Sequence, residues 1–299
     1  MKTKRVLLFI LLCTITCLQL HAQSTIGRQK VDQYPITAWG TPTYGLTWLP
    51  LDYSSDTKKY PLIIFLHGSG ETGTSISSLN NLISTALPQR IAQGWNPEAV
   101  NPVNGEKQKF IVVSPQAPSW SYSYTHVQWI LKDVVSRYRV DTSRIYITGV
   151  SAGGAGTWSC VTNGAPFAQK IAAIVPVSGA GSNTTSESDQ IPLVGGVYGM
   201  KVWSVCGADD SFWSLANTYT NTINTAVPPP AVPALASGIA GAGHSAAAWN
   251  TAYDPTWRNN ALNLNVYEWM LKYSRAAGNP VVPPTVSAGV SQVITLPVN

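Results

Sequence analysis

The sequence predicts an α/β fold, in which helices cover both faces of a mostly parallel central sheet. Short apolar runs alternate along the chain with segments of helical spacing, and Gly and Pro residues separate them. Continuous apolar runs are typical of parallel strands that are buried on both faces. Strands that alternate with helices indicate a doubly wound sheet. The runs that we expect to form strands are residues 62–66, 110–113, 145–148, 171–175 and 201–206.

Two further segments predict helices. Apolar side chains recur at steps of three and four residues between Val127 and Tyr138, which gives the segment one apolar stripe. Residues 261–273 repeat this pattern near the end of the chain. Residues 34–53 alternate instead, and this alternation predicts an antiparallel hairpin at the entry to the sheet.

The composition is that of a globular protein with a neutral polar surface. Of the 299 residues, 44% are hydrophobic and 11% are charged, and this charged share is less than half of the usual one. The formal charge is +5, but Lys2, Lys4 and Arg5 lie at the very start, so the remainder of the chain carries only +2. A charge this small argues against a nucleic-acid partner and against binding to a membrane surface.

The first 22 residues predict a signal peptide. A basic start is followed by the apolar residues 6–12, and the segment ends in His21 and Ala22 before the polar Gln23. This order is typical of a cleaved export signal. The apolar run is short for a bilayer span, which disfavours the alternative of a retained anchor. We therefore expect the protein to be secreted, or to lie at the cell surface or in a periplasm, without membrane contact after cleavage.

The rest of the chain divides into a domain of residues 23–278 and a tail of residues 279–299. The tail is rich in proline, which is typical of a semi-rigid linker, and residues 293–296 then have the composition of a single strand. This tail resembles the opening of a PKD-type, immunoglobulin-like module, and the chain would then be a piece of a longer protein. The alternative is a disordered tail.

Two cysteines, Cys160 and Cys206, remain after the signal segment. Export permits a disulfide between them, but both lie in apolar segments that suit buried thiols. The sequence leaves these two possibilities open. It predicts no metal site and no cofactor.

The motif Gly149-Val150-Ser151-Ala152-Gly153 directly follows one of the predicted strands. A G-x-S-x-G string alone is a weak signal. Between a strand and a helix, however, it is typical of a nucleophile elbow, a tight turn that exposes a strained serine. Glycines on both sides permit this turn because they carry no Cβ. We therefore expect Ser151 to be the nucleophile of an α/β-hydrolase fold.

A serine hydroxyl needs a base, and the order of the chain indicates which one. In this fold the acid and then the histidine follow the nucleophile. Of the four histidines only His244 lies after Ser151, in the small-residue loop 241–245. We expect His244 to be the base. His126 is expected on the surface of a helix or in its first turn.

Four carboxylates lie between the nucleophile and the base. Glu187 and Asp189 fall in a polar loop, whereas Asp209 and Asp210 follow the predicted strand 201–206. That end of the strand is where this fold gathers its functional groups. One residue of the pair is expected to orient the histidine, and the other to be solvated or to cap the next helix. We favour Asp210 as the acid.

A glycine-rich loop follows the first predicted strand. The backbone N–H groups of Ser69 or Gly70, together with that of Ala152, are expected to form an oxyanion hole. His67 is expected to brace this loop and not to act as a second base. Glu71 either orders the same loop or lies in solvent, and we favour the first.

Aromatic residues flank these motifs in the sequence. We expect them either to line a substrate cleft, apolar or suited to stacking on sugars, or to belong to the core. The candidates for substrate binding are Trp120, Trp158, Trp213 and Trp249, and Tyr122 belongs to the same set.

Residues 61–73, residues 140–158 and the Gly243-His244 pair together resemble secreted bacterial carboxylesterases. The first stretch is similar to the oxyanion loop of that group and the second to its nucleophile region. Related groups are feruloyl esterases and polyhydroxybutyrate-depolymerase-like hydrolases, and some members are labelled predicted peptidases. The resemblance covers residues 60–275.

The resemblance implies that the acid stands three positions after the glycine that ends its strand, which again favours Asp210. The sequence departs from the group at Cys206, where histidine is frequent. It departs again at Ala152 and Ala155, where the group has Met and a larger residue. These changes affect the shape of the pocket, so they leave the substrate open.

The motifs and the resemblance together predict a serine ester hydrolase that forms an acyl-enzyme. Its expected substrate is an acetyl or feruloyl ester of an extracellular polysaccharide, or a related polyester. A serine peptidase of the prolyl-oligopeptidase-like type would use the same residues and is the first alternative. A non-catalytic binding module is the second, but it predicts damaged catalytic positions, and here all three are intact.

Overall fold

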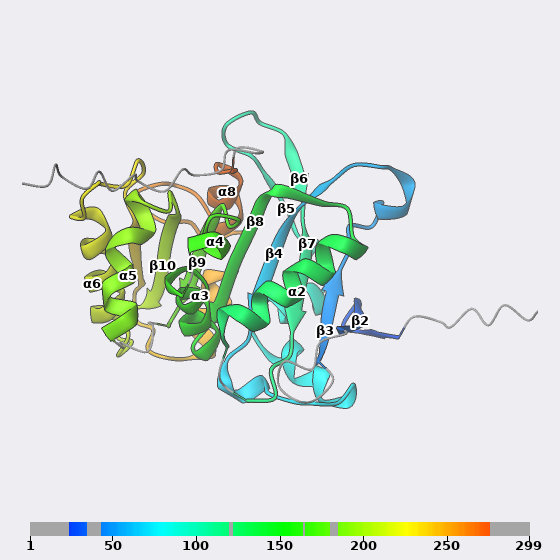
Figure 1. Ribbon diagram of the computed structural model, residues 1–299. Helices are drawn as coiled ribbons and strands as arrows, with labels where there is room; N and C mark the ends of the chain where they lie inside the picture. Colours follow the sequence, from blue (N-terminus) through cyan, green and yellow to red (C-terminus); the bar gives the residue numbers. More distant parts are fainter. Residues whose placement is uncertain (1–23, 35–42, 120–121, 164, 180–184, 276–299) are drawn as a thin grey trace, which may run out of the picture.

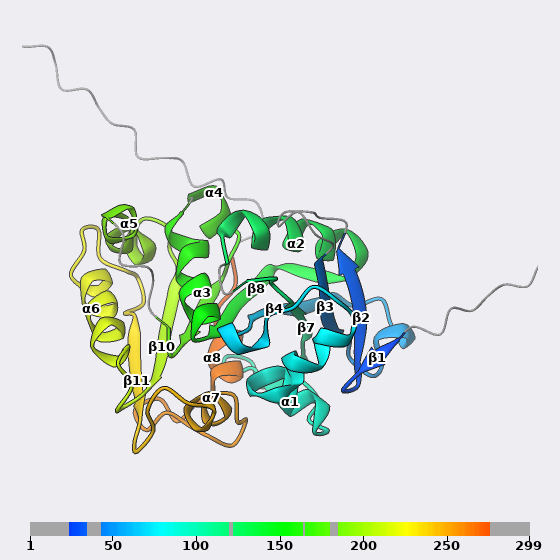
Figure 2. The same ribbon diagram turned by 90° about the horizontal axis from the view of Figure 1, so that it is seen from below.

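A central sheet organises the part of the chain that the structure describes, which is residues 24–34, 43–119, 122–163, 165–179 and 185–275. Within those ranges the central sheet of this computed structural model has nine strands in the order β1-β2-β3-β7-β4-β8-β9-β10-β11 (Figures 1 and 2). They are β1 Thr25–Ile26, β2 Gln29–Tyr34, β3 Thr43–Trp48, β4 Tyr60–Leu66, β7 Ile111–Pro115, β8 Val140–Val150, β9 Ala173–Val177, β10 Lys201–Gly207 and β11 Leu235–Ile239. A separate hairpin joins β5 Glu98–Val100 to β6 Lys107–Lys109.

Most of the described sheet is parallel. The strands β7, β4, β8, β9, β10 and β11 run in one direction, and β3, β2 and β1 extend the sheet beyond β7 by antiparallel pairing. The predicted fold class is therefore confirmed. The five predicted strands correspond to β4, β7, β8, β9 and β10, of which β9 lies two residues later than expected.

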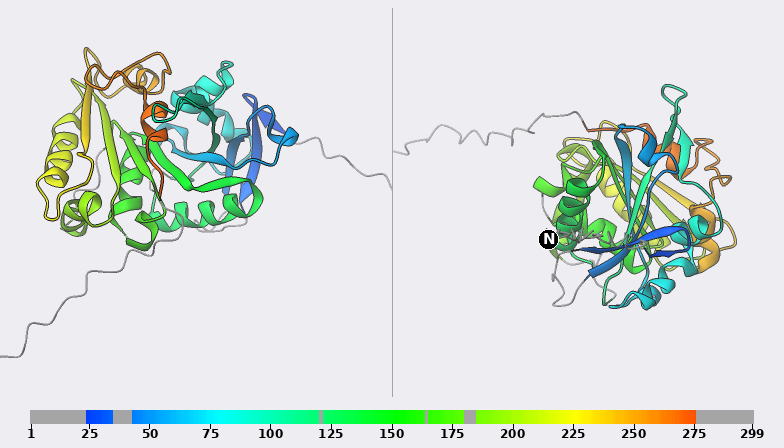
Figure 3. Two further views of the ribbon diagram at one scale, coloured as in Figure 1. Left: turned by 90° about the horizontal axis from the view of Figure 1, so that it is seen from above. Right: turned by 90° about the vertical axis from the view of Figure 1, so that its right-hand side faces the viewer.

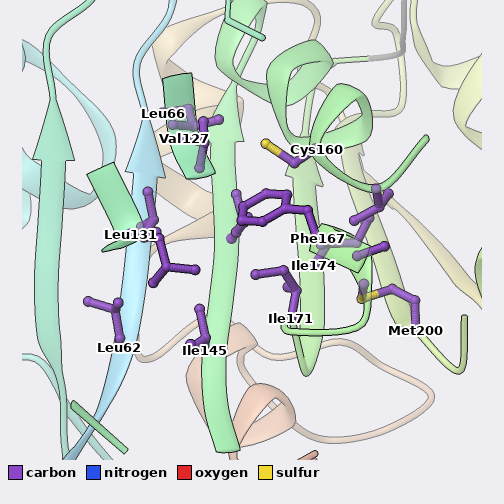
Figure 4. Packing of buried hydrophobic residues seen from close by; sticks show 14 of the residues in the cluster. Leu62, Leu66, Val127, Leu131, Ile145, Cys160, Phe167, Ile171, Ile174 and Met200 are labelled. Atoms are coloured by element: carbon purple, nitrogen blue, oxygen red, sulfur yellow. The ribbon is translucent and has the colours of Figure 1, made fainter. Parts of the chain in front are cut away.

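Helices cover both faces because alternate side chains of the strands point to opposite sides. On β4, Leu62, Ile64 and Leu66 belong to one buried cluster, whereas Ile63 and Phe65 belong to another. Figures 2 and 3 show helices on either side of the sheet, and Figure 4 shows the packing of the first cluster. The first cluster includes α2 Tyr124–Arg137, α3 Ala152–Thr162, α4 Ala165–Ala168, α5 Thr185–Gly196 and α6 Trp213–Asn224, and the second includes α1 Ala86–Ala92, α7 Ala246–Ala252 and α8 Val266–Leu271.

The entry hairpin starts earlier than the predicted range 34–53. β2 and β3 form it, and residues 35–42 between them lie outside the described residues. Residues 49–53 do not continue β3. The apolar pattern did not predict β2 because Gln29 and Asp32 are polar yet only 0% and 3% exposed. It also did not predict β11, whose short sequence mixes small, polar and apolar residues.

The last helix, α8, is shorter than the predicted range 261–273. The side chain of Asn259 accepts two backbone N–H groups in the turn before it. Asn265 then caps α8 by accepting the N–H of Glu268 at 2.9 Å. Asparagine favours such turns and caps, and here this preference outweighs the apolar spacing.

Cys160 and Cys206 are free thiols, both fully buried. Burial raises the pKa of each thiol above its usual value. Of the two possibilities that the sequence left open, the structure has buried thiols.

The predicted signal peptide, residues 1–22, and the predicted linker and module start, residues 279–299, lie outside the described residues. Within the ranges that are described, no helix has the length and apolar character needed to cross a membrane.

A buried aspartate joins the antiparallel strands to α2. The carboxylate of Asp32 accepts hydrogen bonds from Thr47 Oγ1 and Tyr138 Oη, both at 2.6 Å. Lys30 Nζ lies 3.0 Å and Arg137 3.1 Å from it. Burial alone would raise the pKa of Asp32, but these hydrogen bonds and the guanidinium charge outweigh it, so the pKa is lowered.

We expect Asp32→Asn to lower the free energy of unfolding by about 2 kcal/mol at pH 7, because buried donors lose a charged acceptor. The pKa of Asp32 in the folded state is lower than the unfolded value of about 3.9. The ionised carboxylate therefore contributes its full stability at pH values above about 3.9, and this contribution is lost as the pH falls through the folded-state pKa. The difference between the proteins should therefore shrink below pH 4. Denaturant unfolding at pH 3 and pH 7 measures it, with the exposed Asp189→Asn as control. A constant difference would contradict the assignment.

Candidate active site

The serine motif forms a turn of one residue between a strand and a helix. β8 ends at Val150 and α3 begins at Ala152, and Ser151 between them has φ 53° and ψ −116°. Positive φ is strained for a residue with a side chain. The N–H of Ser151 donates to the carbonyl of Val177 on the neighbouring strand at 3.0 Å, which holds the turn in place.

Two glycines make this turn possible. A Cβ on Gly149 would lie 2.5 Å from the carbonyl oxygen of Leu66, and a Cβ on Gly153 would overlap that same oxygen. The backbones of β8, β4 and α3 therefore approach each other more closely than any side chain allows. This close approach is the geometry that a nucleophile elbow requires.

We expect Gly153→Ala to destabilise the fold by about 2 kcal/mol or more, because the added methyl group meets rigid backbone. The variant should also lose reaction of Ser151 with a fluorophosphonate probe, since the turn must open. Thermal unfolding and probe labelling measure both effects. Ser159→Ala on the same helix is the matched control. An alanine variant with wild-type stability would show that α3 has more freedom than the structure indicates.

The structure brings Ser151, His244 and Asp210 into one hydrogen-bonded chain. Ser151 Oγ lies 2.9 Å from His244 Nε2. His244 Nδ1 lies 3.1 Å and 3.2 Å from the two carboxylate oxygens of Asp210. With its proton on Nδ1, His244 donates a hydrogen bond to the carboxylate of Asp210. Its Nε2 then carries no proton and can accept the proton of Ser151. This is the arrangement of nucleophile, base and orienting acid in serine hydrolases.

Neighbouring groups fix the orientation of the acid and the base. The Asp210 side chain is 0% exposed, and one of its oxygens accepts the N–H of Phe212 at 2.9 Å. The rings of Phe212 and Trp249 each lie 5.3 Å from the imidazole of His244, measured between centroids. Phe212 was not predicted from the sequence, where it is an ordinary aromatic residue at the start of a helix.

Asp209 makes no hydrogen bond to His244 among the described residues. Its side chain is exposed, and its backbone N–H donates to the carbonyl of Ala242 at 3.0 Å. Of the two candidate acids, Asp210 is therefore the one that the structure places beside His244.

The environment of His67 excludes a second base. Its Nδ1 lies 2.6 Å from the carbonyl oxygen of Gly68, and its Nε2 accepts the N–H of Ala117 at 2.9 Å. Burial lowers the pKa of His67 to about 4. The ring is therefore neutral at pH 7, with its proton on Nδ1, and it joins the loop after β4 to the loop after β7.

That loop after β4 passes beside the nucleophile. A Cβ on Gly68 would lie 3.6 Å from the Cβ of Ser151, and the next two residues, Ser69 and Gly70, are exposed. Ala152 is the first residue of α3, whose N-terminal end favours negative charge. The N–H groups predicted to form the oxyanion hole thus lie on two segments that adjoin Ser151, the loop after β4 and the start of α3. His126 lies in the first turn of α2, where it forms a capping box with Ser123.

The candidate aromatic residues separate into different groups. Trp158 is 0% exposed, and its indole N–H donates to the carbonyl of Gly179 at 3.2 Å. Its assignment to substrate binding was wrong, because α3 turns it into the core. Trp249 contacts His244, and Trp213 is half-buried at the start of α6. Trp120 lies outside the described residues.

Tyr122 has a structural contact of its own. It is 6% exposed, and its hydroxyl accepts the backbone N–H of His67 at 3.2 Å. It therefore supports the loop after β4 from the core side.

We expect Trp158→Phe to lower stability by about 1–2 kcal/mol, because the carbonyl of Gly179 loses its donor and a small cavity remains. KM for a small ester should stay unchanged, since the ring does not reach the surface. Thermal unfolding and steady-state kinetics on the same preparation measure both. A raised KM with unchanged stability would show that Trp158 contributes to substrate binding and would contradict its assignment to the core.

These elements define an α/β-hydrolase fold, and solved structures share it. One is a thermostable esterase, which is 22% identical with a TM-score of 0.56, and the alignment covers 84% of this chain and 64% of that chain. Another is the feruloyl esterase module of Clostridium thermocellum complexed with sinapinate, with 18% identity, a TM-score of 0.52 and coverage of 77% and 87%. A third is the fluorophosphonate-binding serine hydrolase F of Staphylococcus aureus, with 16% identity, a TM-score of 0.53 and coverage of 81% and 98%.

These similarities establish the fold and leave the substrate to be argued from the site. No family model matches the sequence, and no curated protein matches it. The chain also spans only 64% of the length of the thermostable esterase.

Proposed function

We propose that the protein is a serine ester hydrolase that works through an acyl-enzyme. The observation that carries this proposal is the hydrogen-bonded chain from Ser151 through His244 to Asp210, built on a strained one-residue turn. Solved esterases share the fold, which is consistent with this chemistry.

The geometry supports the following reaction. His244 Nε2 takes the proton of Ser151 as the hydroxyl attacks the ester carbonyl, and Asp210 stabilises the imidazolium that forms. Backbone N–H groups of Ala152 and of Ser69 or Gly70 meet the oxyanion. The imidazolium then gives its proton to the leaving alcohol. Water repeats the sequence on the acyl-enzyme and releases the acid.

The substrate that we propose is an acetyl or feruloyl ester of an extracellular polysaccharide, or a related polyester. Export, predicted from residues 1–22, would place the enzyme where such polymers occur. A feruloyl esterase module is among the structures that share the fold. Trp213 and Trp249, near the acid and the base, are the candidates for a wall that contacts an aromatic acyl group or a sugar.

We expect the protein to release p-nitrophenol from p-nitrophenyl acetate, and Ser151→Ala to lower kcat by at least about 10³-fold, because the variant lacks the hydroxyl that attacks the ester. The wild type should also be labelled by a fluorophosphonate probe. Circular dichroism of the variant controls for folding. If the folded wild type neither hydrolysed the ester nor reacted with the probe, the proposed hydrolase activity would be rejected and a non-catalytic binding module would be favoured.

Acetylated and feruloylated arabinoxylan then test the substrate class. Release of acetate or ferulate would support the polysaccharide ester. Cleavage of peptide substrates with no turnover of esters would instead support the serine peptidase.

A further inference from the structure

A buried carboxyl group lies beside the loop that follows β4. Glu71 is the last residue of the short 3-10 helix Ser69–Glu71 and is 8% exposed. Its Oε2 atom lies 3.0 Å from the position that a Cβ on Gly68 would take, and the Cβ of Ser151 lies 3.6 Å from that same position. The carboxyl and the nucleophile therefore flank one point of the loop backbone.

In the part of the chain that the structure describes, this carboxyl forms no salt bridge. Oε2 is buried and has no hydrogen-bond partner among the described residues. The 3-10 helix Ser77–Ser84, which packs against Ser69–Glu71, contains no charged residue. The segment after β7 binds the loop through Gln116, whose Nε2 donates to the Glu71 carbonyl at 2.8 Å, and residues 116–119 carry no charge.

The titratable neighbours of Glu71 are neutral as well. Burial lowers the pKa of His67 to about 4 and raises the pKa of Tyr122 well above its usual value. Burial also raises the pKa of Glu71 itself, and the backbone N–H groups of Gly68 and Glu71 oppose this rise. Across the loop lies the Ser151 chain with its titratable groups, His244 and Asp210.

A carboxyl that is buried without a counter-ion costs stability when it is ionised. A buried polar group of this kind requires a specific explanation, and a role at a functional site is one such explanation. The backbone N–H groups of Gly68 and Glu71, which belong to the loop itself, favour the ionised form and oppose the rise of the Glu71 pKa. Charge-assisted hydrogen bonds to such donors are about twice as strong as neutral ones, so the ionised carboxylate holds this turn more firmly than a neutral side chain would.

We propose that Glu71 is a positioning residue for the oxyanion loop, a role that rests on the proposed ester hydrolysis. Its carboxylate fixes the backbone of Gly68 from the buried side. The following N–H groups, at Ser69 and Gly70, are thereby held toward the carbonyl that Ser151 attacks. Glu71 does not touch the substrate, and it acts through the position of the donors.

The test compares Glu71→Gln and Glu71→Ala with the wild type in two measurements. With p-nitrophenyl acetate, kcat should fall about 10-fold in the Gln variant and about 100-fold in the Ala variant, because one oxyanion donor is worth about 10²–10³ in kcat. KM should stay within about twofold, since the loop contributes to the transition state and not to ground-state binding.

Thermal unfolding is the second measurement, and it should move in the opposite direction. The pKa of Glu71 in the folded state is raised above the unfolded value of about 4.3. The protonated carboxyl therefore contributes its full stability at pH values below about 4.3, and this contribution is lost as the pH rises through the folded-state pKa. Glu71→Gln should therefore have a higher Tm than the wild type at pH 7 to 8, and the same Tm near pH 4. Glu106→Gln, which removes an exposed carboxylate, is the control and should change neither kcat nor Tm.

A Gln variant with lower kcat and higher Tm supports the positioning role. Wild-type kcat in the Gln variant overturns it, and so does a joint fall of kcat and Tm, which indicates a purely structural role. Because the Gln variant is isosteric, the test stands even where the Ala variant fails to fold. Turnover by the wild type and its loss in Ser151→Ala test ester hydrolysis separately, so failure of the two proposals can be distinguished.

Discussion

The close approach of three backbones around Ser151 is the constraint on which the site depends. β8 must turn into α3 within one residue, and the space between β8, β4 and α3 admits no Cβ at Gly149 or Gly153. The same holds at the next residue of α3, where a Cβ on Gly154 would meet the carbonyl of Val177 on β9 at 2.7 Å. Because each of these contacts involves backbone, the turn has little freedom to relax, and the serine hydroxyl is held at the carboxyl ends of the strands.

The strand order then explains why acid and base arrive in that order along the chain. β8, β9, β10 and β11 are successive parallel neighbours, so their carboxyl ends lie at one edge of the sheet. The acid follows β10 and the base follows β11. Two backbone hydrogen bonds join these loops, from the N–H of Ala208 to the carbonyl of Ile239 and from the N–H of Asp209 to the carbonyl of Ala242. The rejected acid candidate thus has a role, because its backbone links the loop of Asp210 to the loop of His244.

The sequence allowed the elbow and the base to be predicted because both depend on local or ordinal information. Ser151 stands in a short motif, and His244 is the one histidine after it. Asp210 was preferred to its neighbour and the resemblance added to that preference, but two adjacent carboxylates are alike until the loop geometry is known. Trp158 was assigned wrongly because proximity in sequence does not tell which face of a helix a residue occupies. Phe212 could not be predicted, since its role comes from packing against His244.

Some of the buried polar groups that have no hydrogen-bond partner in the described part of the chain lie near the catalytic residues. Among the described residues they include Glu71 Oε2, Ser178 Oγ and the indole N–H of Trp249. Ser178 also has a positive φ of 47°, directly before Gly179, whose Cβ position lies 2.5 Å from the Ser151 carbonyl. Strain and lost hydrogen bonds of this kind each cost about 1–3 kcal/mol, so a fold can hold them only where packing elsewhere compensates. The two apolar clusters on opposite faces of the sheet provide that compensation. The strained serine and its unpaired neighbours therefore occur at the edge of a sheet in which β4, β7, β9 and β10 are almost completely buried.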